Sequence, residues 1–150
     1  AISIAELISD AWSAYARTGH HLQFDNDNDF DIHGDPALLA MIADNALGNA
    51  CAYSPAQSEI RIGLEQTDKS LVIHIRNPCA LEAGNYQQAF DPFWRHDISR
   101  QQSEDHHGLG LALVQRIAQA HQAKVQAHVD DEHIFTLTLE WPIHTKEITS

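Results

Sequence analysis

The chain has 150 residues, of which 43% are apolar, enough for one domain with a hydrophobic core. Its 21 acidic and 9 basic side chains give a formal net charge of -12, which repels phosphate polymers and excludes nucleic acid as an expected partner. No apolar run approaches the ~20 residues that cross a bilayer, and the first residues lack a signal-peptide pattern. We therefore expect a soluble chain that forms a single domain over residues 1–150.

Cysteine and histidine give little sign of metal chemistry. Cys51 and Cys79 lie in apolar segments without metal-ligand spacing, which indicates buried thiols in a reducing compartment rather than a disulfide. The eleven histidines include adjacent pairs at 20–21 and 106–107, whose side chains point apart, and none has acidic partners at zincin spacing. We interpret them as solvated loop residues rather than as metal ligands.

The N-terminal part of the chain predicts a helix, a short strand and a polar loop. Apolar residues spaced i, i+3 and i+4 favour an amphipathic helix over residues 4–16, which Gly19 ends, and residues 21–24 favour a strand. The segment 25–31, DNDNDFD, is too polar and charged for either. It lacks the glycine and the distal Glu of an EF-hand loop, so we interpret it as a solvated turn rather than a calcium site.

A second helix has a strong start signal at residues 34–36. Asp35 can cap the free N–H groups of a helix, and Pro36 then stands where its missing N–H has no cost. The helix is expected to run to about Tyr53 and to end before Pro55.

The rest of the chain predicts two hairpins and one more helix. Alternating apolar residues favour two strands around a turn at 67–70 and two more around 130–132. Between the hairpins come an apolar segment at 86–94, a polar tract at 96–107 and a helix at 111–120. Strands in consecutive pairs with a few helices predict an α+β sandwich whose helices cover one face of the sheet.

Two glycines, Gly108 and Gly110, lie at the N-terminus of that last helix. A glycine inside a helix costs roughly 1 kcal/mol relative to alanine, so a compensating role is expected. Without Cβ atoms, the unpaired N–H groups at a helix N-terminus can touch the oxygens of an anion, and the helix dipole adds attraction. The alternative is a flexible hinge, and the glycines alone leave both open.

Asn45 and Asn49 lie four residues apart in MIADNALGNACAY and therefore share one face of the second helix. Asparagine is a poor mid-helix residue. Its neutral carbonyl oxygen is a fair ligand for Mg²⁺ that keeps most of its waters and is held mainly by nucleotide phosphates. The alternative is a pair of structural amides that bond to a neighbouring loop.

The segment FDPFWRHD, residues 90–97, precedes the polar tract. Phe90 and Phe93 are expected to pack inward, while Arg95 emerges at the start of the tract. A tract of about a dozen residues without apolar anchors is either disordered or a lid that closes on a ligand. Arg95, with Arg100, could then reach a phosphate; otherwise it is a surface arginine in a loose loop.

The order of these motifs resembles the ATP-binding catalytic domain of sensor histidine kinases, in the superfamily that includes gyrase, Hsp90 and MutL. The resemblance covers essentially the whole chain: an Asn-xxx-Asn-Ala helix, a hairpin ending near Asn77, FDPFWR, then GLGLALV. FDPFWR is similar to histidine kinases specifically, which disfavours a serine kinase of the same superfamily. The resemblance implies a two-layer α+β sandwich of the Bergerat type, also called GHKL. Its mixed, mostly antiparallel sheet should have about five strands, with about three helices on one face.

The resemblance also implies ATP and Mg²⁺ as cofactors and assigns roles to residues. In the family's N box, Asn49 would be the metal ligand and Asn45 would shape the metal's water shell, with Arg95 of the F box at the phosphates. Tyr53 would lie near the base and sugar. The nucleotide contacts implied in full are Asn49, Tyr53, Asn77, Cys79, Phe93, Gly108, Leu109, Gly110 and Leu111.

Three departures from the family pattern concern nucleotide binding: one in the G1 box at residues 75–80, one at residue 52 and one at residue 106. Asn77 stands where the family has an Asp that accepts a hydrogen bond from adenine, and loss of the charge is expected to weaken this contact by about 1 kcal/mol, roughly fivefold in affinity. Cys79 and Ala80 replace glycines on a backbone path usually made by residues that tolerate positive φ. Ala52 replaces a basic residue, and His106 replaces a glycine.

The function implied is transfer of the γ-phosphoryl group of Mg-ATP to a histidine on a helical dimerisation domain, for onward transfer to a response regulator. No histidine here has the acceptor pattern, so we expect that domain to be absent and this chain alone to be monomeric. The full protein is expected to be a membrane-associated homodimer with this domain on the cytoplasmic side. The alternative is a degenerate module of the same fold that binds ATP weakly or not at all and acts in docking or regulation.

Overall fold

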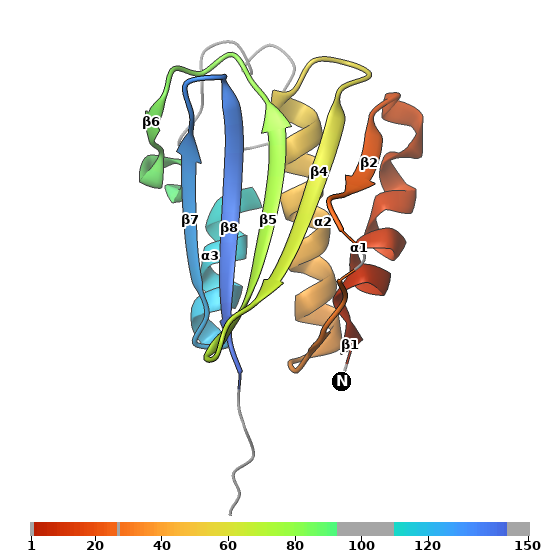
Figure 1. Ribbon diagram of the computed structural model, residues 1–150, viewed down its shortest axis with the longest axis vertical. Coiled ribbons are helices and arrows are strands. Elements are labelled where there is room, and N and C mark those ends of the chain that lie inside the picture. Colours follow the sequence, from red (N-terminus) through yellow and green to blue (C-terminus); the bar gives the residue numbers. More distant parts are fainter. Residues whose placement is uncertain (1, 27, 93–109, 144–150) are drawn as a thin grey trace, which may run out of the picture.

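The structure is a computed structural model that describes residues 2–26, 28–92 and 110–143. Figure 1 shows two layers, a twisted sheet and a set of helices that lie on one of its faces. The elements in chain order are β1 (Ile2–Ser3), α1 (Ile4–Trp12), the 3₁₀ helix η1 (Ser13–Thr18), β2 (His21–Phe24), β3 (Asp31–Ile32), α2 (Pro36–Tyr53), β4 (Glu59–Gln66), β5 (Ser70–Pro78), β6 (Gly84–Asn85), the 3₁₀ helix η2 (Gln87–Phe90), α3 (Gly110–Ala120), β7 (Lys124–Val129) and β8 (Ile134–Pro142).

The main sheet has six strands in the order β2-β4-β5-β8-β7-β6. β2 pairs parallel with β4, and every other neighbouring pair is antiparallel. The short strands β1 and β3 form a separate two-stranded sheet. The predicted mixed, mostly antiparallel sheet with helices on one face is confirmed, and β6 adds a sixth strand to the five expected.

Both predicted hairpins form, β4 with β5 and β7 with β8. Their alternating patterns place one set of side chains against the helices, where the core gathers residues from α2, α3 and the four central strands. Leu47 of α2 and Val114 of α3 are fully buried there. Cys51 is buried as expected, whereas Cys79 is only half-buried because it follows the last residue of β5.

The helix α2 begins where the sequence predicts. The carboxylate of Asp35 accepts hydrogen bonds from the backbone N–H groups of Ala37 (2.9 Å) and Leu38 (3.3 Å), and Pro36 is the first helical residue. The helix ends at Tyr53, before Ser54. Capping and proline placement therefore set the residue at which α2 begins, and burial of its apolar residues in the core sets its rotation.

The predicted helix over residues 4–16 is shorter than expected. The α-helix α1 ends at Trp12, and the chain continues as the 3₁₀ helix η1 to a left-handed Gly19 at φ +82°. The Ser13 hydroxyl donates to the carbonyl of Asp10 at 2.8 Å. Side chains that bond to nearby backbone compete with the α-helical pattern, which accounts for the change of helix type at this residue.

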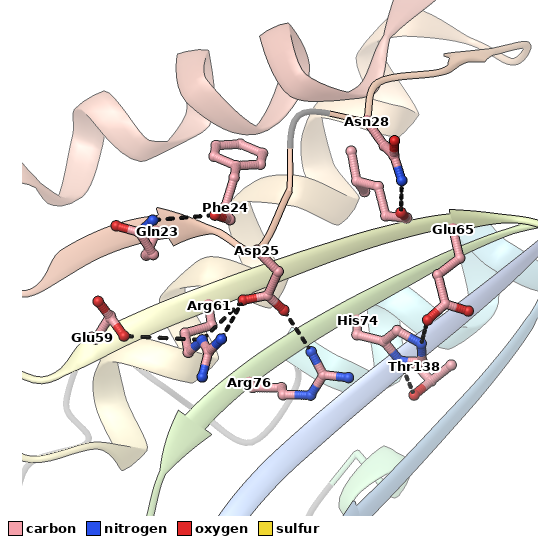
Figure 2. Close-up of polar contacts among 11 residues, drawn as sticks. Gln23, Phe24, Asp25, Asn28, Glu59, Arg61, Glu65, His74, Arg76 and Thr138 are labelled. Carbon is pink, nitrogen blue, oxygen red and sulfur yellow. Dashed lines mark hydrogen bonds and ion pairs between the residues drawn. The ribbon is translucent and has the colours of Figure 1, made fainter.

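The described residues of the acidic segment 25–31 are mostly exposed, as expected for a solvated turn, and several of their side chains also bond to the sheet and to α1. Figure 2 shows Asp25 between Arg61 of β4 (2.8 Å) and Arg76 of β5 (3.0 Å). The Asn28 amide donates to the carbonyl of Leu64 at 3.1 Å. The carboxylate of Asp29 accepts from the Ser3 hydroxyl at 2.6 Å and from the backbone at the start of α1. These bonds hold the described residues between β2 and β3 against the sheet and α1.

None of the helices that the structure describes combines the length and apolar character needed to span a bilayer.

Candidate functional site

The first turn of α3 lies against the middle of α2. A Cβ atom built on Gly110 would stand 3.4 Å from the side-chain oxygen of Asn45 and 3.9 Å from its backbone oxygen. These are ordinary contact distances, and the φ of Gly110 is not in the left-handed region. Packing against the described residues therefore does not require a glycine here. A glycine also places no Cβ between the backbone N–H groups of the first turn and a bound anion.

Asn45 and Asn49 stand one helical turn apart on α2, and both are half-buried. The Asn45 amide nitrogen donates to the carbonyl of Met41 at 2.8 Å, which leaves its oxygen directed away from that bond. Among the described residues, none forms a hydrogen bond with the Asn49 side chain, although the amide is half-buried. A half-buried amide oxygen without a protein donor fits a role as ligand to a hydrated cation.

Tyr53 stands one turn beyond Asn49 and is also half-buried. The three residues Asn45, Asn49 and Tyr53 follow at intervals of four, so one face of α2 carries all three. The side chain of Leu111 is buried in the core instead, so only its backbone N–H can contribute to the site.

Asn77 is almost completely buried, with 1% of its surface exposed, near the end of β5. Its amide nitrogen donates to the carbonyl of Pro78 at 2.8 Å. Because a carbonyl can only accept, this bond fixes the nitrogen and leaves the amide oxygen as the free acceptor. No donor to that oxygen comes from any residue in the described ranges. Asn77 therefore presents a neutral acceptor.

Cys79 and Ala80, which stand where the family has glycines, follow a backbone path that any residue can adopt. Neither residue has a positive φ; the left-handed residue of this region is His133, at φ +63°. The N–H of Cys79 donates to the carbonyl of His133 at 2.9 Å, which continues the β5–β8 pairing past Pro78. The sheet thus holds this path without glycine. Burial raises the pKa of the Cys79 thiol, which keeps it protonated and unreactive at neutral pH.

Four predicted site residues, Phe93, Arg95, Gly108 and Leu109, lie outside the described residues. Phe90 of the same F-box segment is buried in η2, as predicted.

One contact near the site was not predicted. The Tyr15 hydroxyl, from η1, lies 2.9 Å from both the backbone oxygen and the carboxylate of Asp44, the residue before Asn45. Burial first, and then the hydrogen bond and charge of Asp44, raise the pKa of Tyr15 well above its ordinary value. In the helix predicted over residues 4–16, Tyr15 is one of the apolar positions. The spacing of apolar residues gives no information about the partner of its hydroxyl.

The described residues contain no cluster of three or more His, Cys, Asp or Glu side chains that could hold a metal ion. A metal at the α2 face would therefore depend on amide oxygen, water and ligand phosphate rather than on a protein cage.

Comparison with known proteins gives the following similarities. A sequence profile described as "Histidine kinase-, DNA gyrase B-, and HSP90-like ATPase" matches residues 34–145. The chain is 32% identical over 100 residues to the probable sensor kinase SilS of Salmonella typhimurium, and 33% identical over 108 residues to the sensor histidine kinase CusS of Escherichia coli O157:H7. These alignments cover 66% and 71% of this chain but 20% and 22% of the relatives. The chain thus spans about a fifth of their length.

Two solved structures share the fold. The mycobacterial sensor histidine kinase MprB aligns with a TM-score of 0.76 at 18% identity, over 94% of this chain and 95% of that chain. A nucleotide-free catalytic domain of the histidine kinase ThkA aligns with a TM-score of 0.74 at 19% identity, over 94% of each chain. The two-layer α+β architecture expected for a GHKL-type domain is confirmed.

Proposed function

Because the chain belongs to the histidine kinase-, DNA gyrase B- and HSP90-like ATPase family, we propose that it is the ATP-binding catalytic domain of a sensor histidine kinase. In this proposal it binds Mg-ATP and donates the γ-phosphoryl group to a histidine on a separate helical dimerisation domain. That histidine then passes the group to an aspartate of a response regulator. The similarity to the sensor kinases SilS and CusS supports this assignment.

The closeness of Gly110 to Asn45 is the observation that carries the proposal. It joins the helix with the two asparagines to the N-terminus of the helix that follows the glycines, although the residues are far apart in sequence. A triphosphate bound at this junction would meet unpaired backbone N–H groups on one side and amide oxygens on the other. This convergence is what a nucleotide site built from the two motifs requires, and it therefore supports the proposal.

The proposed reaction breaks the bond between the γ-phosphorus and its bridging oxygen and forms a bond from that phosphorus to a ring nitrogen of the acceptor histidine. ADP leaves with the bridging oxygen, and the imidazole releases one proton. The protein's part is to hold the triphosphate in line and to offset the developing charge. The N–H groups at Gly108, Gly110 and Leu111 would contact phosphate oxygens, and Arg95 would add a positive charge. Bound Mg²⁺ would neutralise phosphate charge, with Asn49 as its protein ligand and Asn45 beside its waters.

The base would lie toward Asn77, Cys79, Tyr53 and Phe93. Asn77 offers adenine an uncharged oxygen, so its bond to the amino group is weaker than that of a carboxylate.

Titration of Mg-ATP onto the purified chain, followed by calorimetry, tests the proposal. Saturable binding at or below millimolar ATP is expected, and Asn49→Asp should weaken it while leaving thermal unfolding of the nucleotide-free chain nearly unchanged. If Asn49 is structural, the substitution will instead lower the unfolding temperature.

A second candidate function is a degenerate module of the same fold, used for docking or regulation. The neutral Asn77 and the alanine at position 52 favour it, since each removes a charge that would help to hold the nucleotide. Absence of saturable binding at millimolar Mg-ATP would select this function over the kinase.

The partners follow from the kinase proposal: the protein's own dimerisation and phosphoacceptor domain, and a receiver domain. The full-length protein would be a membrane-associated homodimer with this domain on the cytoplasmic side, and the isolated chain a monomer. The net charge of -12 argues against nucleic acid. A phosphotransfer assay with a supplied dimerisation domain tests the acceptor.

A further inference from the structure

A separate cavity of about 230 Å³ lies at the other end of the sheet from Asn77. Its lining includes Gln66 at the end of β4, Leu71 at the start of β5 and Trp141 at the end of β8. Leu71 and Asn77 are six residues apart on one strand, which places the cavity about 20 Å from Asn77 along β5. In Figure 1 this is the end near the label of β1. None of the residues assigned to the nucleotide lines it.

The inner wall of the cavity is apolar. Ile32, Leu71 and Trp141 line it and are each at least nine-tenths buried. Ile32 and Trp141 also line a second, smaller cavity of about 30 Å³, whose lining residues are all apolar. The two cavities therefore share a partition made of two apolar side chains. A ligand that enters the outer cavity can therefore bury its own apolar part against this wall.

The mouth of the cavity is polar and carries negative charge. Asp31, His33 and Gln66 line it and are exposed. Asp31 is the acidic residue of the lining, and the described residues that form the lining include no lysine or arginine. The protein's net charge of -12 adds to the negative potential at this mouth. An amine is therefore attracted to the mouth, and a carboxylate is repelled.

We propose that this cavity binds a small organic cation, an amine that carries one aromatic or branched aliphatic group. The apolar group lies against Leu71 and Trp141, and the ammonium group faces the carboxylate of Asp31. The volume is below the ~300–1,000 Å³ of sites for drug-sized molecules, so the ligand has one ring and a short chain. This site does not depend on the proposed kinase activity.

The test uses two probes of the same shape and opposite charge, 2-phenylethylamine and 3-phenylpropionate, at neutral pH. Binding to the purified chain is followed by ¹H–¹⁵N NMR, with the indole N–H of Trp141 as reporter and Trp141→Phe to assign it. The amine should bind saturably in the millimolar range and shift this signal, at least about fivefold more tightly than the acid. Absence of saturation at tens of millimolar amine, or equal binding of both probes, would overturn the proposal.

Two variants test the assigned contacts. Asp31→Asn keeps the shape of the mouth and should abolish most of the preference for the amine. Its matched control is Asp131→Asn, an exposed acid in the turn between β7 and β8 at the opposite end of the sheet, which should retain the preference. Ile143→Trp fills the cavity and should prevent binding of both probes. An unchanged preference in Asp31→Asn would contradict the assignment of the charge.

Discussion

The side-chain oxygen of Asn45 in α2 stands 3.4 Å from the point where a Cβ of residue 110 would lie. A methyl group thus fits at Gly110 without a clash among the described residues. Alanine is also favoured over glycine in a helix by up to ~1 kcal/mol. We predict that Gly110→Ala leaves the unfolding temperature of the nucleotide-free chain unchanged or raised, yet weakens Mg-ATP binding about tenfold by covering backbone donors.

The measurements are thermal unfolding without nucleotide and calorimetric titration of Mg-ATP. Ala120→Gly, at the exposed far end of α3, serves as the matched control: it should lower stability and leave affinity unchanged. Parallel losses of stability and affinity in Gly110→Ala would mean that the glycine serves packing.

Asn77→Asp should separate stability from nucleotide affinity. At 1% exposure the new carboxylate would be buried beside the Pro78 carbonyl and would lose the 2.8 Å bond that the amide makes. We expect a loss of about 1–3 kcal/mol in the unfolding free energy without nucleotide. A charged acceptor should strengthen the adenine contact about fivefold.

Urea denaturation gives the stability, and titration with ATP and GTP gives the affinities. The gain in affinity should appear for ATP and not for GTP, because guanine has a carbonyl where adenine has an amino group. A variant that improves ATP and GTP binding equally would place Asn77 away from the base.

Local signals in the sequence predicted most of the fold. Asp35 and Pro36 predicted the start of α2, and the alternation of apolar and polar residues predicted the four long strands. The strands β1, β3 and β6 were not predicted. Each has two residues, too few to show an alternating pattern, and each pairs with a strand far away in the sequence.

The site was less accessible to sequence analysis. Spacing placed Asn45 and Asn49 on one face of a helix, but only the resemblance related that face to the glycines some 60 residues later. The bond from Tyr15 to Asp44 and the position of Asp25 between two strands depend on tertiary packing, which has no local signature.

Asp25 should contribute to stability by offsetting the repulsion between two positively charged side chains. Arg61 and Arg76 are directly opposite on β4 and β5, and the Asp25 carboxylate contacts both. Like charges at opposed positions destabilise a sheet, so Asp25→Asn removes two ion pairs and leaves a repulsive pair. The side chain of Arg61 is 54% exposed, so solvent screens much of its interaction with Asp25. We predict that the substitution lowers the unfolding free energy by about 1 kcal/mol.

The loss should shrink when salt is raised to about 0.5 M, because screening weakens both the attraction and the repulsion. Urea denaturation at low and high salt measures it, with Asp10→Asn on the exposed face of α1 as the control. A loss that does not change with salt would indicate a role in loop geometry rather than in charge.

His74 should make the protein less stable in weakly acidic solution. Burial, followed by the charge of Arg76, lowers the pKa of His74 in the folded protein below 6.5, although Glu65 at 3.7 Å opposes this. Since the unfolded chain then binds more protons near this pH, the unfolding free energy is highest above pH 6.5. It falls as the pH drops through 6.5 toward the folded-state pKa.

We predict that His74→Gln reduces the loss of stability between pH 7.5 and 5.5, measured by urea denaturation at each pH. The effect should be specific to this side chain, which lies on β5 between Thr138 of β8 and Glu65 of β4 (Figure 2). His21→Gln, at an exposed position of β2, should keep the full pH dependence of the native protein. If both variants lose stability as steeply as the native protein, burial of the His74 imidazole is not what makes folding sensitive to acid.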